Sequence, residues 1–304
     1  MKIETMTNAA RTLEARGLCK QYGKQTVLDH VDLAVEPGCI YGLIGRNGAG
    51  KTTLLSILTG QNTKNSGEVT YGGEPVWENP RALSDLCFAR ELNPGSEVAA
   101  LQVEEYLLAA RLFCPRWDEE YARTLIKKFG LDTKKRINKL SKGQMSMVTI
   151  TAALASRAPV TILDEPAAGL DVVMRECFYR LLLDDYAETN RTFVISTHII
   201  EEAAGVFERV IVLDEGRVIA NSQTDDLVDQ FRYVSGSAQA VDRALAACGL
   251  QPLQQQGMGP HKTAAVRGTP EQFARLAAEP DLELSGLNLQ NVFVALCGHG
   301  DEEG

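Results

Sequence analysis

The residues from Gly45 to Thr53 have the types and the spacing of a phosphate-binding loop. They match the pattern G-x-x-x-x-G-K-[S/T] and are, in order, Gly45, Arg46, Asn47, Gly48, Ala49, Gly50, Lys51, Thr52 and Thr53. Glycines let successive backbone N–H groups converge on a polyphosphate, because no Cβ stands in the way. We expect Lys51 to bridge the β- and γ-phosphates, Thr52 to offer its hydroxyl to Mg²⁺, and Thr53 to donate to a phosphate. The chemistry indicated is phosphoryl transfer.

Two elements can hold this loop in place. The apolar run at 40–44 predicts a buried strand before it, and the apolar spacing of 54–58 predicts a helix that starts near Lys51. The positive end of that helix then points at the anion. A glycine-rich turn that carries Lys-Thr by coincidence is the alternative, and the flanking strand and helix argue against it.

Two carboxylates follow a second strand. Residues 160–163 are largely apolar and lead into Asp164, Glu165 and Pro166. Because α/β proteins place ligands at the carboxyl edge of such strands, we expect Asp164 to hold Mg²⁺ through a water and Glu165 to polarise the attacking water. The alternative is that the acids only complement a helix dipole, with Pro166 in the first turn. The phosphate loop favours the catalytic role.

A predicted helix start at residues 141–144 is a second candidate anion site. Ser141 fits the N-cap position, and Lys142, Gly143 and Gln144 form the first turn, with backbone N–H groups free to bind a phosphate. A simple cap explains Ser141. A cap gives no reason for a Gly and a Gln in the first turn, and these two unexplained residues indicate function.

Two ring side chains have open interpretations. Tyr22 precedes a predicted turn at Gly23-Lys24, where it can stack on an adenine ring or pack as an ordinary strand residue. His198 follows a strand that ends near Ser196, so it can contact a γ-phosphate or simply be a polar residue at a strand end.

The remaining pattern predicts an α/β fold. Buried strands separated by helices indicate a mostly parallel sheet with both faces covered, and these strands are expected at 160–163, 192–196 and 209–214. The alternation over 11–33 and the strand pair over 65–73 predict an antiparallel layer. Helical spacing over about 93–156 predicts a helical subdomain that interrupts the series.

Composition limits the kind of protein this can be. A chain of 304 residues with 44% apolar residues can form one large domain and a small one, and its net charge of −9 argues against nucleic acid as a partner. Seven scattered cysteines without a C-x-x-C pair indicate reduced thiols. No secretion signal or membrane-spanning window is present, so we expect a cytoplasmic protein that touches a membrane only through a partner.

As a set, these residues resemble the nucleotide-binding subunit of ABC transporters over residues 11–225. The resemblance implies a P-loop NTPase core with an antiparallel β layer and a helical subdomain. It assigns adenine stacking to Tyr22, the Walker A loop to 45–53, the signature sequence to 140–144, Walker B to 160–165, the D-loop to 168–171 with Asp171, and the switch histidine to His198.

In that family two such domains dimerise head to tail around ATP. Ser141 and Gly143 would then face the γ-phosphate of the ATP that the opposite subunit binds. The resemblance implies ATP and Mg²⁺ as ligands, hydrolysis with Glu165 and His198 as catalytic residues, and a homodimer or heterodimer on a separate integral membrane permease, at the inner face of the membrane. The single domain with a C-terminal extension is most similar to ATPases of ABC-2-type exporters of drugs and antimicrobial peptides.

Two positions depart from the family pattern. Lys142 stands where the family usually has Gly, which adds a positive charge near the opposite nucleotide. Glu91 stands where the family places a Gln between the core and the helical subdomain. A Gln there can ligate Mg²⁺, and a carboxylate oxygen can do so with extra charge. The expected metal ligands are therefore Thr52, Asp164 and Glu91.

Residues 226–304 are predicted to form a small α+β module. The order of strand, helix, strand, strand, helix, strand and helix over 231–296 suggests a ferredoxin-like fold. No ligand motif is visible there, and a role in dimerisation or regulation rests on analogy with the family.

The motifs indicate a domain that hydrolyses ATP, but they do not indicate which process the hydrolysis drives. A soluble ABC ATPase that moves a cytosolic scaffold or assembly complex would carry the same motifs. Chromosome-maintenance relatives have a long coiled coil between the Walker motifs and ribosome-binding relatives a second nucleotide domain, and this chain has neither. A transport ATPase is the favoured interpretation.

Overall fold

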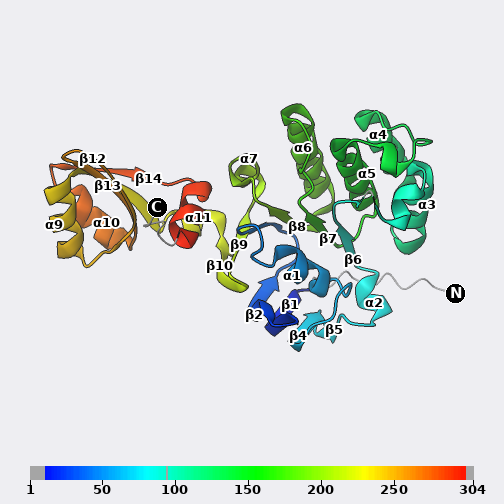
Figure 1. Ribbon diagram of the computed structural model, residues 1–304, viewed down its shortest axis with the longest axis horizontal. Coiled ribbons are helices and arrows are strands. Elements are labelled where there is room, and N and C mark those ends of the chain that lie inside the picture. The colour runs from blue at the N-terminus through cyan, green and yellow to red at the C-terminus, as the bar shows by residue number, and fades with distance from the viewer. Residues whose placement is uncertain (1–10, 94, 299–304) are drawn as a thin grey trace. The chain divides into compact units, whose positions relative to one another are not determined.

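The structure, a computed structural model, describes residues 11–93 and 95–298. This part of the chain forms two compact units (Figure 1). The first contains residues 11–198 and 211–221, and the second contains residues 199–210 and 222–298.

A six-stranded sheet carries the phosphate loop, in the strand order β10-β9-β3-β8-β7-β6. Its strands are β3 (Ile40–Ile44), β6 (Leu86–Ala89), β7 (Val160–Asp164), β8 (Thr192–Thr197), β9 (Arg209–Asp214) and β10 (Arg217–Gln223). Neighbouring strands from β3 to β6 run parallel, and every residue of β3, β7 and β8 is buried. The predicted α/β fold is confirmed, since such runs form strands covered on both faces.

An antiparallel sheet forms a second layer, in the order β2-β1-β4-β5. Its strands are β1 (Leu13–Tyr22), β2 (Gln25–Val35), β4 (Ser66–Tyr71) and β5 (Glu74–Pro75). Helix α1 (Lys51–Leu58) lies between the layers (Figure 1). Its Leu54 and Leu55 share one core with Leu13 of β1 and Ile162 of β7. Because Leu54 and Leu55 are buried against both sheets, the start of α1 is held next to the phosphate loop.

The predicted helical subdomain is present. Its helices are α3 (Val103–Phe113), α4 (Glu119–Phe129) and α5 (Lys142–Ala155), and α3 and α4 pack on α5. Asp118 caps α4, and Gly130 ends it in the left-handed conformation. The other helices of the first unit are α2 (Pro80–Leu83) and α6 (Val172–Thr189), with short 3₁₀ turns at Glu97–Ala100 and Ile137–Lys139. The second unit begins with α7 (Ile200–Ala203), a 3₁₀ turn at Ala204–Val206 and α8 (Thr224–Val228).

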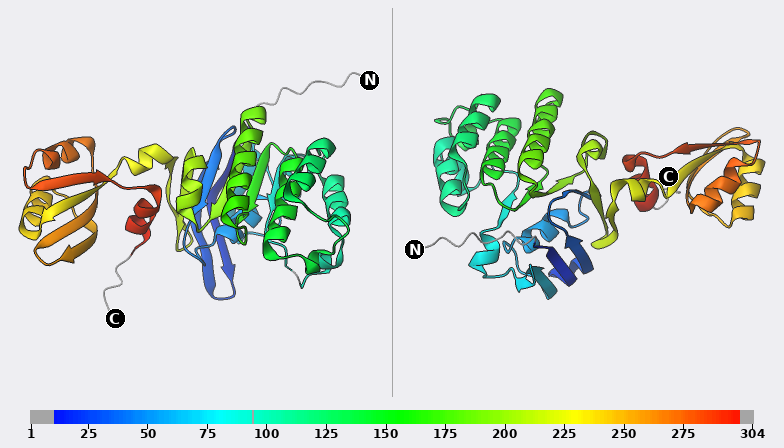
Figure 2. Two further views of the ribbon diagram at one scale, coloured as in Figure 1. Left: turned by 90° about the horizontal axis from the view of Figure 1, so that it is seen from above. Right: turned by 180° about the vertical axis from the view of Figure 1, so that it is seen from behind.

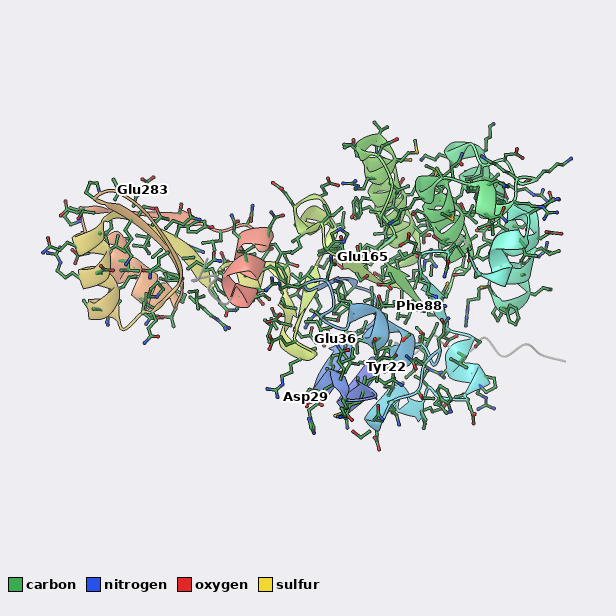
Figure 3. The ribbon with its side chains drawn as sticks, in the orientation of Figure 1. Tyr22, Asp29, Glu36, Phe88, Glu165 and Glu283 are labelled. Atoms are coloured by element: carbon green, nitrogen blue, oxygen red, sulfur yellow. The ribbon has the colours of Figure 1, made fainter. Side chains whose placement is uncertain are left out.

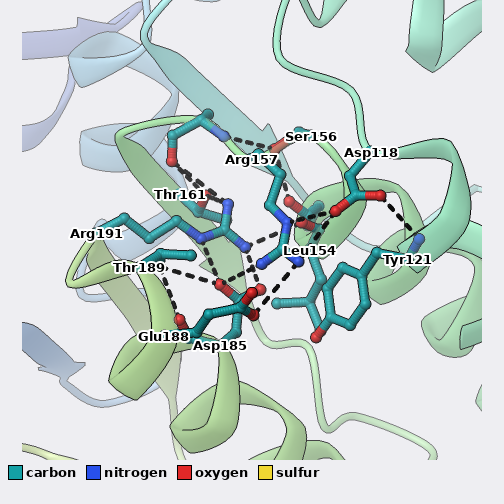
Figure 4. A network of polar contacts seen from close by, with 12 residues as sticks. Asp118, Tyr121, Leu154, Ser156, Arg157, Thr161, Asp185, Glu188, Thr189 and Arg191 are labelled. Carbon is teal, nitrogen blue, oxygen red and sulfur yellow. Dashed lines mark hydrogen bonds and ion pairs between the residues drawn. The ribbon is translucent and has the colours of Figure 1, made fainter.

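A buried ion pair joins α6 to the start of β8 (Figure 4). Asp185 on α6 accepts two hydrogen bonds from Arg191, from Nε at 2.9 Å and from Nη2 at 2.6 Å. Arg191 also donates to the carbonyl oxygen of Leu154 at the end of α5 and to the hydroxyl of Thr161 on β7. The guanidinium therefore connects two helices and two strands of the sheet.

The second unit contains a ferredoxin-like module. Its elements are β11 (Phe231–Ser237), α9 (Ala238–Cys248), β12 (Pro252–Met258), β13 (His261–Arg267), α10 (Pro270–Ala277), β14 (Leu282–Gly286) and α11 (Leu289–Cys297). Its strands pair antiparallel in the order β12-β13-β11-β14. Leu245 of α9 and Leu276 of α10 share a core with Val234 and Ala264, so both helices cover one face of the sheet (Figure 2). The predicted element order is the order found.

Candidate nucleotide-binding site

The phosphate loop joins β3 to α1. Gly50 precedes the helix with a φ of 103°, and in the described chain this helix start has neither a side-chain cap nor an acidic residue in its first turn. Its N–H groups and positive end can therefore serve an anion. Lys51 is 7% exposed, and its ammonium donates to the carbonyl oxygens of Gly45 at 2.8 Å and Arg46 at 3.3 Å. A buried cation beside an uncapped helix start suits the phosphates of ATP.

Gly45 is required by packing within the protein, whether or not a phosphate is bound. A Cβ at Gly45 would lie 2.4 Å from the carbonyl oxygen of Leu213 on β9. Ala49 is buried, and Thr53 is half-buried in α1. The exposed residues of the loop and helix start are Arg46, Asn47, Gly48 and Thr52. The Thr52 side chain is thus open to a ligand, as its predicted role requires.

Strand register brings the predicted acids and the histidine to one edge of the sheet. Asp164 at the end of β7 lies opposite Ser196 on β8, and Ile44 at the end of β3 lies opposite Thr197. Glu165 comes next in the chain. Its Oε2 lies 2.7 Å from Nδ1 of His198, and its Oε1 lies 3.7 Å from Nζ of Lys51. The carboxylate therefore contacts both the histidine and the loop lysine.

The backbone at Glu165 is unusual. Its φ of 50° is in the region that favours glycine, and its N–H donates to Oγ of Ser196 at 2.9 Å. The same hydroxyl donates to Oδ1 of Asp164 at 2.5 Å. Non-glycine residues in this conformation cluster at functional sites. Ser196 orients both acids, and sequence reasoning missed it, because its only signal is its place at the end of a buried strand.

Tyr22 ends β1, and its side chain is half exposed. It is 49% exposed, its hydroxyl accepts a hydrogen bond from Nδ2 of Asn62 at 2.6 Å, and the ammonium of Lys20 lies 4.9 Å from its ring centre (Figure 3). A core-packing role does not fit this exposure. Adenine stacking by Tyr22 remains a prediction.

The start of α5 corrects one sequence argument. Ser141 Oγ accepts from the backbone N–H of Gln144 at 3.2 Å, and Oε1 of Gln144 accepts from the backbone N–H of Ser141 at 3.1 Å. This reciprocal pair is a capping box. Gln144 therefore has a structural reason for its place in the first turn, so its presence there is no longer an argument for function, and its role at the opposite nucleotide stays a prediction.

Gly143 is needed for close contact with the loop after β7. A Cβ at Gly143 would lie 2.6 Å from the carbonyl oxygen of Gly169. One turn further along α5, Ser146 Oγ donates to the carbonyl oxygen of Ala168 at 2.8 Å. The loop ends at Asp171, which caps α6 by accepting from the N–H of Met174 at 2.9 Å. The predicted signature helix and D-loop are thus in direct contact within one chain.

The two departures from the family pattern contact each other. Nζ of Lys142, the first residue of α5, lies 3.1 Å from Oε1 of Glu91. Glu91 follows β6, the strand beside β7, so it lies at the sheet edge that carries Asp164 and Glu165. Sequence reasoning named both residues without connecting them.

Comparison with known proteins gives the family. Residues 28–168 match the family model of the ABC transporter domain. The bacitracin transport ATP-binding protein BcrA of Bacillus licheniformis is 32% identical over 217 residues, which make up 71% of each chain. The chain belongs to the ABC transporter ATP-binding subunits. It is accordingly an ABC-type ATPase, and the predicted family is confirmed.

Two further similarities define how far this relationship extends. The ABC transporter ATP-binding protein YtrB of Bacillus subtilis is 26% identical over 290 residues, or 94% of this chain and 98% of YtrB. This match includes the C-terminal module of the ABC ATPase. A solved ATP-binding subunit of an ABC transporter is 28% identical with a TM-score of 0.62, over 72% of this chain and 92% of that one. In the part of the chain that the structure describes, no helix has the length and apolarity to cross a membrane.

Proposed function

We propose that this ABC ATPase hydrolyses MgATP as one half of a dimer and so powers a separate integral membrane permease. The observation that supports the proposal is the position of the Glu165 carboxylate, between Lys51 at 3.7 Å and His198 at 2.7 Å. There it can accept a proton from the water that attacks the γ-phosphate, while Lys51 binds the phosphates. His198 orients the carboxylate.

The same edge offers oxygen ligands for a magnesium ion. Hydroxyl and carboxylate oxygens suit Mg²⁺, and the proposed ligands are Thr52, Asp164 and Glu91. Asp164 is only 7% exposed, and the Ser196 hydroxyl fixes one of its oxygens. Bound Mg²⁺ would neutralise phosphate charge during transfer. The donor set therefore fits the metal.

Exposed apolar residues support a dimer. Val172 and Val173, which directly follow Asp171, are each 70% exposed. Valines at such exposure are suited to burial against a second subunit. In the proposed dimer, the start of α5 at Ser141 and Gly143 binds the γ-phosphate held by the opposite phosphate loop. A pair of identical chains and a pair with a homologous subunit both satisfy this geometry.

The permease is proposed to contact the helical subdomain. Along α3, Leu108, Leu112 and Phe113 are 56%, 78% and 84% exposed, and together they form an apolar strip. Such a strip can bind a segment of a membrane subunit and place the ATPase at the cytoplasmic face. We propose export as the direction, by analogy with a relative named for Nod factor export, which is 32% identical over 225 residues. Other relatives are named for import, such as a tungstate uptake protein at 32% identity.

Glu165→Gln tests the catalytic role. We expect phosphate release to fall to the background rate while MgATP still drives dimerisation, because the amide keeps the shape but cannot accept the proton. Steady-state phosphate release and size-exclusion chromatography measure the two properties. Turnover at the parent rate would refute the role of Glu165.

The Glu165→Gln form also identifies the partner. We would use it with MgATP to pull down proteins from detergent-solubilised membranes of the native host, with Lys51→Ala as the matched control that cannot close on ATP. A membrane protein with several spans that is enriched only with Glu165→Gln supports the proposal. Enrichment of a soluble complex alone would contradict it and favour the scaffold ATPase.

A further inference from the structure

The side chain of Lys142 connects three segments of the ATPase. Its ammonium lies 3.1 Å from the carboxylate of Glu91, which follows β6. Its methylene stem crosses Gly169 in the loop after β7, since a Cβ there would lie 2.6 Å from Cγ of Lys142. Lys142 itself begins α5. Gly143, the next residue, meets the carbonyl oxygen of Gly169 from the same helix turn.

Electrostatics explain why Glu91 belongs at this position. A lysine at the first residue of a helix is unfavourable, because its charge repels the positive end of the helix dipole. In the described chain, the first turn of α5 contains no acidic residue. Glu91 supplies the missing negative charge from another segment. The two departures from the family pattern therefore compensate each other.

Glu91 can also interact with a divalent cation at the sheet edge. Ala89 at the end of β6 lies opposite Leu163, the residue before Asp164, so Glu91 lies along the same sheet edge as the two acids at the end of β7. A carboxylate there attracts a divalent cation, and an ammonium paired with that carboxylate weakens the attraction. The Lys142 and Glu91 side chains are 53% and 48% exposed, so the pair can exchange partners.

We propose that Lys142 is a positioning residue for the ATPase reaction. Its ammonium pairs with Glu91, and this pairing lowers the affinity of the site for the divalent cation of MgATP. The inference rests on the proposed function, in which Glu91 is a metal ligand. Through this pair, the start of the signature helix regulates the metal site of its own chain.

The test is a double-mutant cycle with Mn²⁺ as the probe. Mn²⁺ is titrated into full-length Glu165→Gln protein with equimolar ATP, and free Mn²⁺ is followed by electron paramagnetic resonance; ATP without protein gives the contribution of the nucleotide. We expect Lys142→Gln to tighten Mn²⁺ binding about two- to fivefold when Glu91 is present, and to change nothing in the Glu91→Gln background. A purely structural role would not depend on Glu91.

Two controls define the cycle. Lys142→Arg keeps the charge and should retain the parent affinity. Arg123→Gln removes an exposed pair with Glu119 on α4, 3.2 Å apart, and should have no effect. Unfolding temperatures check that each variant is folded.

Two results would overturn the proposal. An equal shift, or no shift, from Lys142→Gln in both Glu91 backgrounds would refute the inference alone. Failure of the Glu165→Gln parent to bind Mn²⁺ with ATP would refute the proposed metal site and this inference with it.

Discussion

Ser196 contacts both acids of the proposed catalytic edge through one hydroxyl. It is fully buried, and Oγ lies within hydrogen-bond distance of the Asp164 carboxylate and of the Glu165 N–H. We expect Ser196→Ala to lower kcat about tenfold or more, because loss of a hydrogen bond to a charged group costs roughly 1.5–3 kcal/mol and Glu165 loses its restraint. Steady-state phosphate release measures the rate.

Ser84→Ala is the control for that substitution, since Ser84 Oγ bonds only locally, to the carbonyl oxygen of Arg81 at 2.8 Å. A parent-like kcat in Ser196→Ala would show that Glu165 holds its conformation without the hydroxyl.

Asp118 gives a pH-dependent contribution to stability. Its hydrogen bond from the N–H of Tyr121, together with the one from Arg157, lowers the pKa of its carboxyl below the usual value. The carboxylate form is thus preferred in the folded state, so its contribution is present above about pH 4 and is lost as the pH falls through the lowered pKa. We expect Asp118→Ala to cost about 1 kcal/mol at pH 7, the typical value of an N-cap, and less at pH 3. Urea unfolding at both pH values measures this, and an equal loss at both would contradict it.

At the scale of elements, the Asp185–Arg191 pair is a buried ionic link between α6 and the start of β8. The two side chains are 0% and 5% exposed. We expect Asp185→Asn to lower the free energy of unfolding by about 3–5 kcal/mol, because it leaves a buried guanidinium without its counter-charge. Urea unfolding measures the loss.

Glu176→Gln on the same helix is the matched control. It removes an exposed pair with Arg180, 2.9 Å apart, and should cost less than about 1 kcal/mol. A similarly small loss in Asp185→Asn would mean that the remaining hydrogen bonds of Arg191 suffice.

Elements with a strong local signal could be predicted from the sequence. The apolar runs of β3, β7 and β8 and the strand–helix order of the C-terminal module were predicted close to their observed bounds. Strand β6 was not, because it has four half-buried residues at a sheet edge and no clear period. The Ser141–Gln144 capping box fits a known local pattern, so the sequence alone was enough to predict this structural role of Gln144 beside the proposed functional one. The Lys142–Glu91 contact has no local signal, because it depends on how α5 packs against the sheet.

At the scale of the whole molecule, the two units have separate cores. Leu276 of α10 is fully buried among residues of the ferredoxin-like module. We expect Leu276→Ala to destabilise this module by about 2–5 kcal/mol without loosening the ATPase unit. Native-state hydrogen exchange checks this: amides of α9 and β13 should exchange faster, and those of β3 and β7 should not. Faster exchange in both sets would show that the units unfold together.

The position of β3 in the central sheet has a consequence for the synthesis of the protein. Ile40 pairs with Phe193, so the strand that precedes the phosphate loop lacks its β8 neighbour until roughly 150 more residues have left the ribosome. At about 5–20 residues per second, this wait is on the order of 8–30 s. During it, the buried face of β3 and α1 is exposed on an unfinished chain. The widest strand pairing in the ferredoxin-like module joins Arg232 to Gly286, so its pairing partners leave the ribosome much closer together and it can fold soon after it emerges.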